Sequence, residues 1–202
     1  MNVRTDNRIV FYGDPHGNWE PLIEAVALAP PAAVVILGDC ELTRPLPTEL
    51  DSVWHLVPAW RWIIGNHDVE SLVEYESLVD GHPAGDLGGK VERLAGIGIA
   101  GLGGVFRARV WYPRPPDAAP AFPSRAGMVA RTARADRFRG GVPRSSCATI
   151  FPEDVATLAQ QRADILVCHE APTSHPAGFT VIDELAAAMG VRLVVHGHHH
   201  CS

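Results

Sequence analysis

The C-terminal stretch Val194-Val195-His196-Gly197-His198-His199-His200 decides how the rest of the chain is interpreted. A short apolar run stops at a glycine and is followed by three consecutive histidines, which predicts a strand that presents imidazoles at its carboxyl end. Residues i and i+2 of an extended segment point to the same side, so His198 and His200 can face one cluster. That spacing suits metal ligands. The alternatives are a purification tag or solvated surface histidines, and ligands at other strand ends decide between them.

Length and composition set the broad class of protein. The chain has 202 residues, of which 47% are hydrophobic, so we expect one domain spanning residues 1–202. The apolar runs are the length of strands, which predicts no membrane span and a cytoplasmic protein. Four cysteines without C-x-x-C spacing indicate reduced thiols rather than a disulfide framework.

Charge is unevenly distributed along the chain. Between residues 107 and 144 there are nine arginines and two aspartates, a balance of +7, whereas the whole chain carries −6 and the remainder therefore about −13. The same region is rich in proline and shows little periodicity, so we expect a cap or loop insertion at about 106–147. The basic stretch is available for an anionic substrate, and the acidic remainder contains carboxylates that could bind metal.

The first forty residues predict a βαβ unit. Two short apolar strands each end at a glycine that is followed by an acid, and a helix with apolar residues at helical spacing lies between them. Parallel strands place their carboxyl ends at one edge of a sheet, so Asp14, His16 and Asp39 should meet there. The expected elements are strand 8–13, helix 19–29 and strand 33–37.

The rest of the chain repeats this pattern with less regularity. Apolar runs at 53–57 and 60–64 lead to Gly65-Asn66-His67-Asp68, and a strand at 164–167 leads to His169. The glycine-rich run 97–105 predicts a strand whose glycines let another backbone pass closely. The other expected elements are helix 70–79, a helix around 127–138, helix 152–161, helix 180–189 and strand 192–195.

Five strand ends thus carry mixed oxygen and nitrogen donors. Such a set suits first-row divalent ions better than a structural zinc site, and it is too large for one ion. Two ions that share Asp39 would use seven of these residues as ligands. The residues concerned are Asp14, His16, Asp39, Asn66, His67, His169, His198 and His200.

In this order the motifs D-x-H, G-D, G-N-H-D, a strand-end histidine and G-H-x-H resemble the calcineurin-like metallophosphoesterase superfamily over residues 8–200. The resemblance implies an α/β fold, a four-layer α/β/β/α sandwich of two mostly parallel or mixed sheets flanked by helices. It implies two divalent metal ions, Mn²⁺ first, with Fe, Zn, Co, Ni or Mg as alternatives. A hydroxide bridging the two ions would hydrolyse a phosphomonoester or phosphodiester.

Residue roles follow from the same resemblance. The first metal would be bound by Asp14, His16, Asp39 and His200, and the second by Asp39, Asn66, His169 and His198. The catalytic histidine would be His67, which protonates the leaving group or stabilises the transition state, with Asp68 orienting its ring.

Three arginines are candidates for binding substrate phosphate, because a guanidinium matches two phosphate oxygens. Arg44 follows the second strand, and Arg107 and Arg109 open the basic stretch. A solvated loop arginine is the alternative for Arg44, and a surface that binds nucleic acid or a protein partner is the alternative for the basic stretch.

The sequence therefore predicts a phosphoesterase that acts on a small phosphorylated substrate or nucleotide. A dinucleoside polyphosphate hydrolase and a phosphoprotein phosphatase are alternatives within the same fold. A nuclease and a catalytically silent interaction module are further alternatives. The sequence leaves the oligomeric state open.

Overall fold

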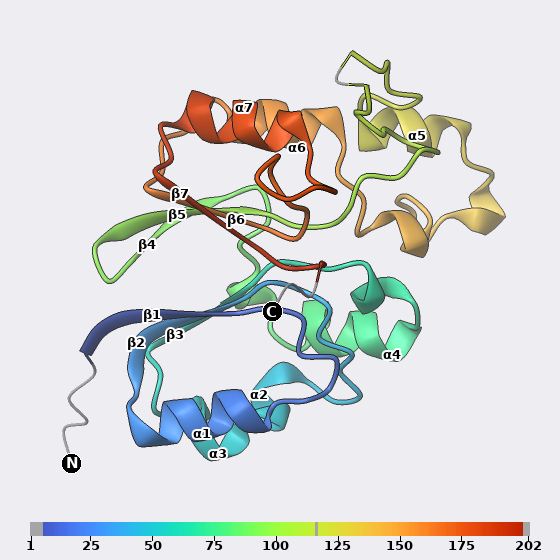
Figure 1. Cartoon of the computed structure of the whole chain (residues 1–202). Coiled ribbons are helices and arrows are strands. Elements are labelled where there is room, and N and C mark those ends of the chain that lie inside the picture. Colours follow the sequence, from blue (N-terminus) through green and yellow to red (C-terminus); the bar gives the residue numbers. More distant parts are fainter. Residues whose placement is uncertain (1–5, 116, 200–202) are drawn as a thin grey trace.

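The computed structural model describes residues 6–115 and 117–199, which form two sheets facing each other (Figure 1). The first sheet has three parallel strands in the order β1-β2-β3. The second has the order β4-β5-β6-β7, in which β4 and β5 are antiparallel and the other pairs are parallel. The strands are β1 (Asp6–Tyr12), β2 (Pro31–Ile36), β3 (Ala59–Trp62), β4 (Val91–Leu94), β5 (Ile97–Leu102), β6 (Ile165–Cys168) and β7 (Leu193–His196).

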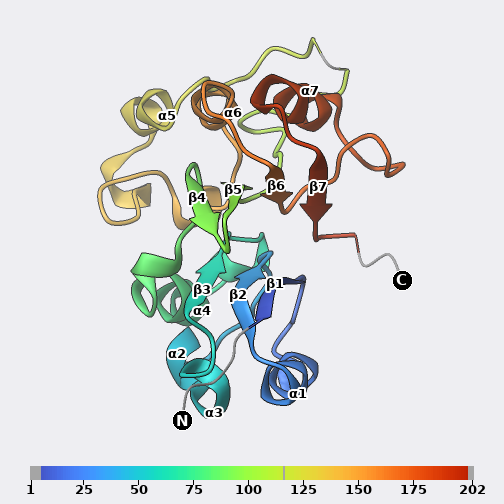
Figure 2. The same ribbon diagram turned by 90° about the vertical axis from the view of Figure 1, so that its left-hand side faces the viewer.

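Helices cover the outer face of each sheet, and Figure 2 shows the resulting layers end on. Three helices, α1 (Glu20–Leu28), α2 (Leu46–Glu49) and α3 (Asp51–Trp54), lie against the first sheet. Two helices, α6 (Pro152–Leu158) and α7 (Thr180–Met189), lie against the second. The predicted α/β/β/α sandwich is therefore confirmed.

Successive side chains of the central strands point to opposite faces of the sheet, and both faces carry apolar side chains. In β2, Val34 and Ile36 pack under the helices, whereas Val35 faces the other sheet. In β6, Leu166 packs under α6 and α7, whereas Val167 faces the first sheet. All five side chains are fully buried, so the strands read as continuous apolar runs, as expected for sheets covered on both sides.

The glycine-rich strand behaves as predicted. A Cβ atom on Gly101 would lie 2.6 Å from the carbonyl oxygen of Leu87, and Gly101 pairs with Gly88 in an isolated bridge. The missing side chain lets the chain that leaves the first sheet cross closely over β5.

Several elements differ from the sequence prediction. Strand β4 was not predicted, because Val91–Leu94 has only two aliphatic residues and is paired at one edge only. The apolar run 53–57 lies in α3 and the turn after it. The helix predicted over 70–79 is α4 (Leu72–Tyr75), which continues as the π-helix Glu76–Asp80, and the helix around 127–138 is the shorter α5 (Arg125–Arg131).

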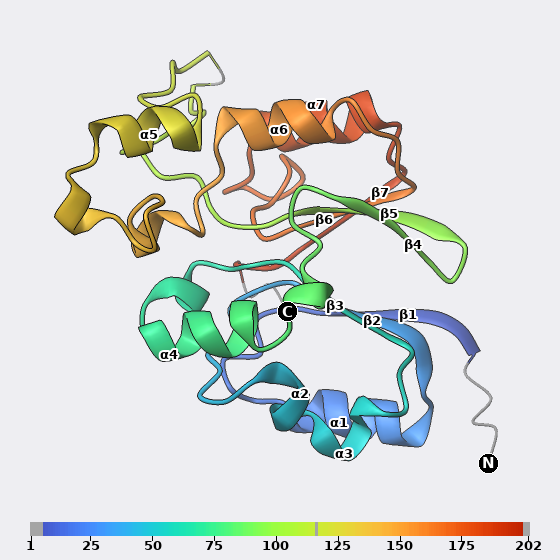
Figure 3. The same cartoon turned by 180° about the vertical axis from the view of Figure 1, so that it is seen from behind.

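The described part of residues 106–147 (106–115 and 117–147), called here the arginine-rich segment, lies beside α6 at the end of the sandwich where the parallel strands have their carboxyl ends (Figures 1 and 3). The segment has its own small apolar cluster of Val110, Met128 and Val142 with Phe151. Arg139 ties it to the π-helix through Asp80, at 2.7 Å, and Glu76, at 2.8 Å. Short 3-10 helices complete the chain at His67–Val69, Pro83–Gly85, Arg134–Asp136 and Arg144–Ser146.

Within residues 6–115 and 117–199, no helix is both long enough and apolar enough to cross a membrane.

Candidate metal centre

Two groups of potential metal ligands lie at the carboxyl ends of the strands, and they share Asp39. One consists of Asp14, His16 and Asp39, and the other of Asp39, His169 and His198; within each group the ligand atoms lie within 4.8 Å of one another. The first sheet supplies the first group, through the turns after β1 and β2. The second sheet adds the two histidines that follow β6 and β7. The structure therefore brings together five of the predicted ligands.

Backbone conformation at these positions is unusual. Seven described non-glycine residues have positive φ, and five of them lie at this site. Left-handed conformations are unfavourable for residues with a Cβ atom, and they concentrate where a site imposes them. The five are Asp14 (47°), His16 (43°), Asp39 (54°), Glu41 (50°) and His198 (70°).

Gly65 allows the loops after β2 and β3 to approach each other. A Cβ atom at this position would lie 2.2 Å from Oδ1 of Asp39, so only glycine fits. The next residue, Asn66, directs Oδ1 to within 3.3 Å of Nε2 of His169. The predicted amide ligand thus lies beside the second group.

A hydrogen bond from one ring nitrogen holds the side chain of His169 in one orientation. Its Nδ1–H donates to the carbonyl oxygen of Leu37 at 2.7 Å, so Nε2 faces Oδ2 of Asp39 at 3.2 Å. Burial would lower the pKa of His169, but the hydrogen bond and charge of Asp39 raise it overall. Burial alone would raise the pKa of Asp39, but the hydrogen bond and charge of His169 oppose this, and the pKa of Asp39 is lowered overall. A divalent cation bound here would displace the proton from Nε2.

Two contacts join the ligands to neighbouring residues. Nδ1 of His16 lies 2.6 Å from Oε1 of Glu41, which fixes the orientation of the ring. The backbone N–H of His198 donates to both carboxylate oxygens of Asp14 at 2.9 Å. The sequence analysis did not predict Glu41, because its contact with His16 depends on the loop conformation at Glu41.

His67 lies at the edge of the two groups, and its ring is 5.3 Å from that of His16 in an edge-on arrangement. Its backbone N–H donates to Oδ1 of Asp39 at 2.8 Å. Its Nδ1 lies 2.9 Å from Oε1 of Glu70, so Nε2 is the nitrogen that can face a substrate. The predicted partner of this ring was Asp68, and that prediction is wrong, because Glu70 holds the ring.

Asp68 instead joins the loop after β2 to the loop after β3 through hydrogen bonds to their backbones. Its carboxylate accepts hydrogen bonds from the backbone N–H groups of Gly65 at 2.7 Å, Asp39 at 3.0 Å and Cys40 at 2.7 Å. Burial raises the pKa of Asp68 to about 6, against the opposing effect of the N–H donors. Asp68 is therefore a positioning residue.

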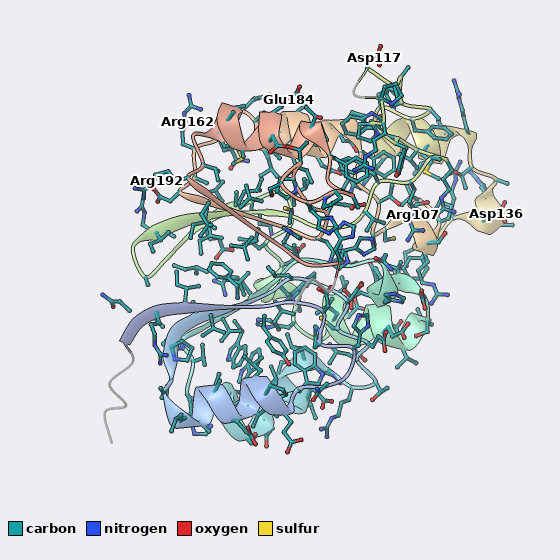
Figure 4. The ribbon with its side chains drawn as sticks, in the orientation of Figure 1. Arg107, Asp117, Asp136, Arg162, Glu184 and Arg192 are labelled. Carbon is teal, nitrogen blue, oxygen red and sulfur yellow. The ribbon has the colours of Figure 1, made fainter. Side chains whose placement is uncertain are left out.

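A pocket of about 330 Å³ adjoins the ligand groups, and it contains one of the three predicted substrate arginines. Arg107 lines it, whereas Arg109 donates to Ser145 outside it and Arg44 is ion-paired with Glu49 at 2.7 Å. Figure 4 places Arg107 at the end of the molecule where the strands end, and Arg162 and Arg192 at the opposite end. The pocket is lined by Asn66, Val105, Phe106, Arg107, Tyr112, Arg114, Glu170, Ala177, Phe179, His198 and His199.

The donor set fits divalent metal ions. Carboxylate oxygens and imidazole nitrogens meet at short range, and Nε2 of His169 faces the oxygens of Asp39 and Asn66, which are themselves predicted ligands. His200, the remaining predicted ligand, lies outside the described residues. The ligand assignment as a whole stays a prediction.

Comparisons with known proteins agree with this geometry. The family model described as calcineurin-like phosphoesterase matches residues 7–202. A protein of Haemophilus influenzae, described as uncharacterized, is 40% identical over 193 residues, which cover 95% of this chain and 83% of that protein. No solved structure matches the chain.

Proposed function

The chain belongs to the calcineurin-like phosphoesterase family, and from this membership we propose that it hydrolyses small phosphoesters with a pair of divalent metal ions. The observation that carries the proposal is the sharing of Asp39 by two ligand groups. A carboxylate between two groups is the arrangement that a two-metal site requires. The first sheet would hold one ion through Asp14 and His16, and the second sheet would hold the other through His169 and His198.

The metals would supply activation of water at neutral pH and neutralisation of phosphate oxygens. Mn²⁺ is our first candidate from the family membership, and the mixed carboxylate and imidazole donors suit a first-row divalent ion. Fe, Zn, Co, Ni and Mg remain alternatives.

The chain's own groups orient the reaction. The oxygen of water bonds to phosphorus, and the bond from phosphorus to the leaving oxygen breaks. His67 lies beside the ligand groups with Nδ1 held by Glu70, so its Nε2–H can donate the proton that the leaving oxygen needs. Glu70 fixes the orientation of the ring of His67, whose side chain is 36% exposed and therefore in contact with solvent.

The size of the pocket favours a small substrate. A volume of about 330 Å³ is at the lower end of the range for small-molecule sites. This supports a low-molecular-weight phosphoester over a folded phosphoprotein.

The test is hydrolysis of p-nitrophenyl phosphate and of bis-p-nitrophenyl phosphate with Mn²⁺ supplied. We expect turnover of at least one of them that a chelator abolishes and that Asp39→Asn removes. The control is Asp136→Asn, an identical chemical change on the exposed edge of the arginine-rich segment (Figure 4). No turnover by the wild type with any of the six metals would reject the proposal.

A further inference from the structure

The pocket beside the ligand groups has walls of two kinds. Asn66 and His198 form the wall that it shares with the proposed metal site. The opposite wall combines the guanidinium groups of Arg107 and Arg114 with the rings of Phe106, Tyr112 and Phe179. A group bound there would lie next to the proposed metal site.

Arg107 has a buried side-chain nitrogen that is available to bind an anion. Its Nε is buried and has no hydrogen-bond partner among residues 6–115 and 117–199, and within these residues it forms no ion pair. A buried donor without a partner costs free energy, which a ligand that accepts its hydrogen bond would recover. The nearby carboxylate of Glu170 already accepts from the backbone N–H of Phe106 at 2.9 Å. Arg107 therefore has capacity that the described protein does not use.

Arg114 forms a flat platform rather than a second free cation. Its guanidinium carbon lies 4.6 Å from the centre of the Phe179 ring, and its NH2 donates to the carbonyl oxygen of Gly178. Tyr112 meets the same ring edge-on at 5.3 Å and is 42% exposed. A guanidinium plane and an accessible phenol ring favour a flat, π-rich ligand.

We propose that this pocket binds the leaving group of a nucleotide substrate, with Arg107 on a phosphoryl group and Arg114 and Tyr112 against the base. The proposal rests on the proposed function and names its substrate class. One phosphoryl group, one sugar and one base form a ligand suited to the size of the pocket. The preceding phosphorus would lie at the metals, joined through a bridging oxygen to the phosphoryl group on Arg107. The oxygen of water bonds to that phosphorus, its P–O bond to the bridging oxygen breaks, and the nucleotide leaves with the bridging oxygen on its phosphoryl group.

The contrast between Arg107 and Arg109 gives a matched control. Both arginines lie in the same turn, but Arg109 is exposed and donates to Oγ and the carbonyl oxygen of Ser145 at 2.9 and 2.8 Å. Removal of either side chain removes one positive charge from the same region. Only Arg107 faces the pocket.

The experiment measures binding by calorimetry in a chelator, so that bound metal does not contribute. The probes are adenosine 5′-monophosphate, adenosine and ribose 5-phosphate. In the wild type and in Arg109→Ala we expect the nucleotide to bind at least about tenfold more tightly than adenosine, as for a charge-assisted hydrogen bond. In Arg107→Ala that ratio should fall below about threefold.

The base contact is tested with Tyr112→Ala, which changes an exposed ring and should leave the fold intact. We expect the preference for the nucleotide over ribose 5-phosphate to be about tenfold in the wild type and to shrink in this variant. Thermal unfolding checks that all variants are folded.

The proposal is overturned if the wild type binds the nucleotide no more tightly than adenosine, or if the ratio survives in Arg107→Ala. Nucleotide binding is measured without metal and tests this inference, whereas hydrolysis of aryl phosphates is measured with metal and tests the proposed function. A failure of this inference is therefore distinguishable from a failure of the proposed function.

Discussion

The two sheets contribute different halves of the site. The three-stranded half supplies the carboxylates Asp14 and Asp39 with His16, and the loops that carry them have strained backbones. The four-stranded half supplies the imidazoles of His169 and His198 and most of the adjoining pocket. The first half is thus rich in oxygen donors and charge, and the second provides nitrogen donors and a binding surface.

Neither half holds a complete site, because the key contacts cross between the sheets. Nδ1 of His169 donates to Leu37 in the first half, and the backbone of His198 donates to Asp14. The apolar layer between the sheets, which includes Val35 and Val167, holds the halves in register. Metal binding should therefore depend on the packing of the sheets as well as on the ligands themselves.

The largest expected effect is at the residue that belongs to both halves. Asp39→Asn should lower hydrolysis at least about 10³-fold and reduce bound metal in both groups, because the shared carboxylate is lost. In His16→Ala and His198→Ala only one group is damaged, so each should retain about one metal per chain. Elemental analysis of the purified variants measures this difference. Equal metal loss in all three variants would contradict the shared-carboxylate account.

His67 should separate chemistry from metal binding. We expect His67→Ala to lower turnover about 10²- to 10³-fold while its metal content equals that of the wild type, because the ring donates a proton and is not in either ligand group. Glu70→Gln should have a smaller effect of about tenfold, since it only supports that ring. Steady-state kinetics with metal analysis checks both variants, and metal loss in His67→Ala would oppose the assigned role.

Asp68 tests how the first half is held together. An amide has one acceptor oxygen where the carboxylate has two, so Asp68→Asn should cost about 3 kcal/mol of unfolding free energy. The control is in the second half, where half-exposed Asp164 accepts from the backbone N–H of Gly98 at 2.9 Å. Asp164→Asn should cost about 1 kcal/mol. Urea unfolding of metal-free protein compares them, and equal costs would count against the role of Asp68 in joining the loops.

An effect confined to one ligand group is expected at the residue beside His16. Glu41→Gln removes the charge that orients this ring and should weaken metal binding in the first group about 10- to 100-fold. Binding in the second group should be unchanged. Competitive metal titration resolves the two sites, and equal weakening of both would show that Glu41 does not act through His16.

The sequence predicted which candidate ligands lie together better than it predicted their surroundings. Asp14, Asp39, His169 and His198 follow strands, and the rule that parallel strands end at one edge was sufficient to bring them together. The partners of these residues depend on loop conformation. Glu41 reaches His16 because its own φ is 50°, which no apolar pattern indicates.

The roles of charged neighbours were harder to predict for the same reason. Asp68 follows His67 in the chain, but the short 3-10 helix there directs the Asp68 carboxylate towards backbone N–H groups. The same helix brings Glu70 to the His67 ring. Arg107 and Arg109 were indistinguishable in sequence, and only the turn between them separates the pocket from the surface.

The most direct test of the paired site is a crystal structure of the protein grown with Mn²⁺, with anomalous differences recorded at the manganese edge. We predict two peaks roughly 3.5–4 Å apart on either side of the Asp39 carboxylate. One should lie against Asp14 and His16, and the other against His169 and His198. A single peak, or two peaks that do not share Asp39, would contradict the account.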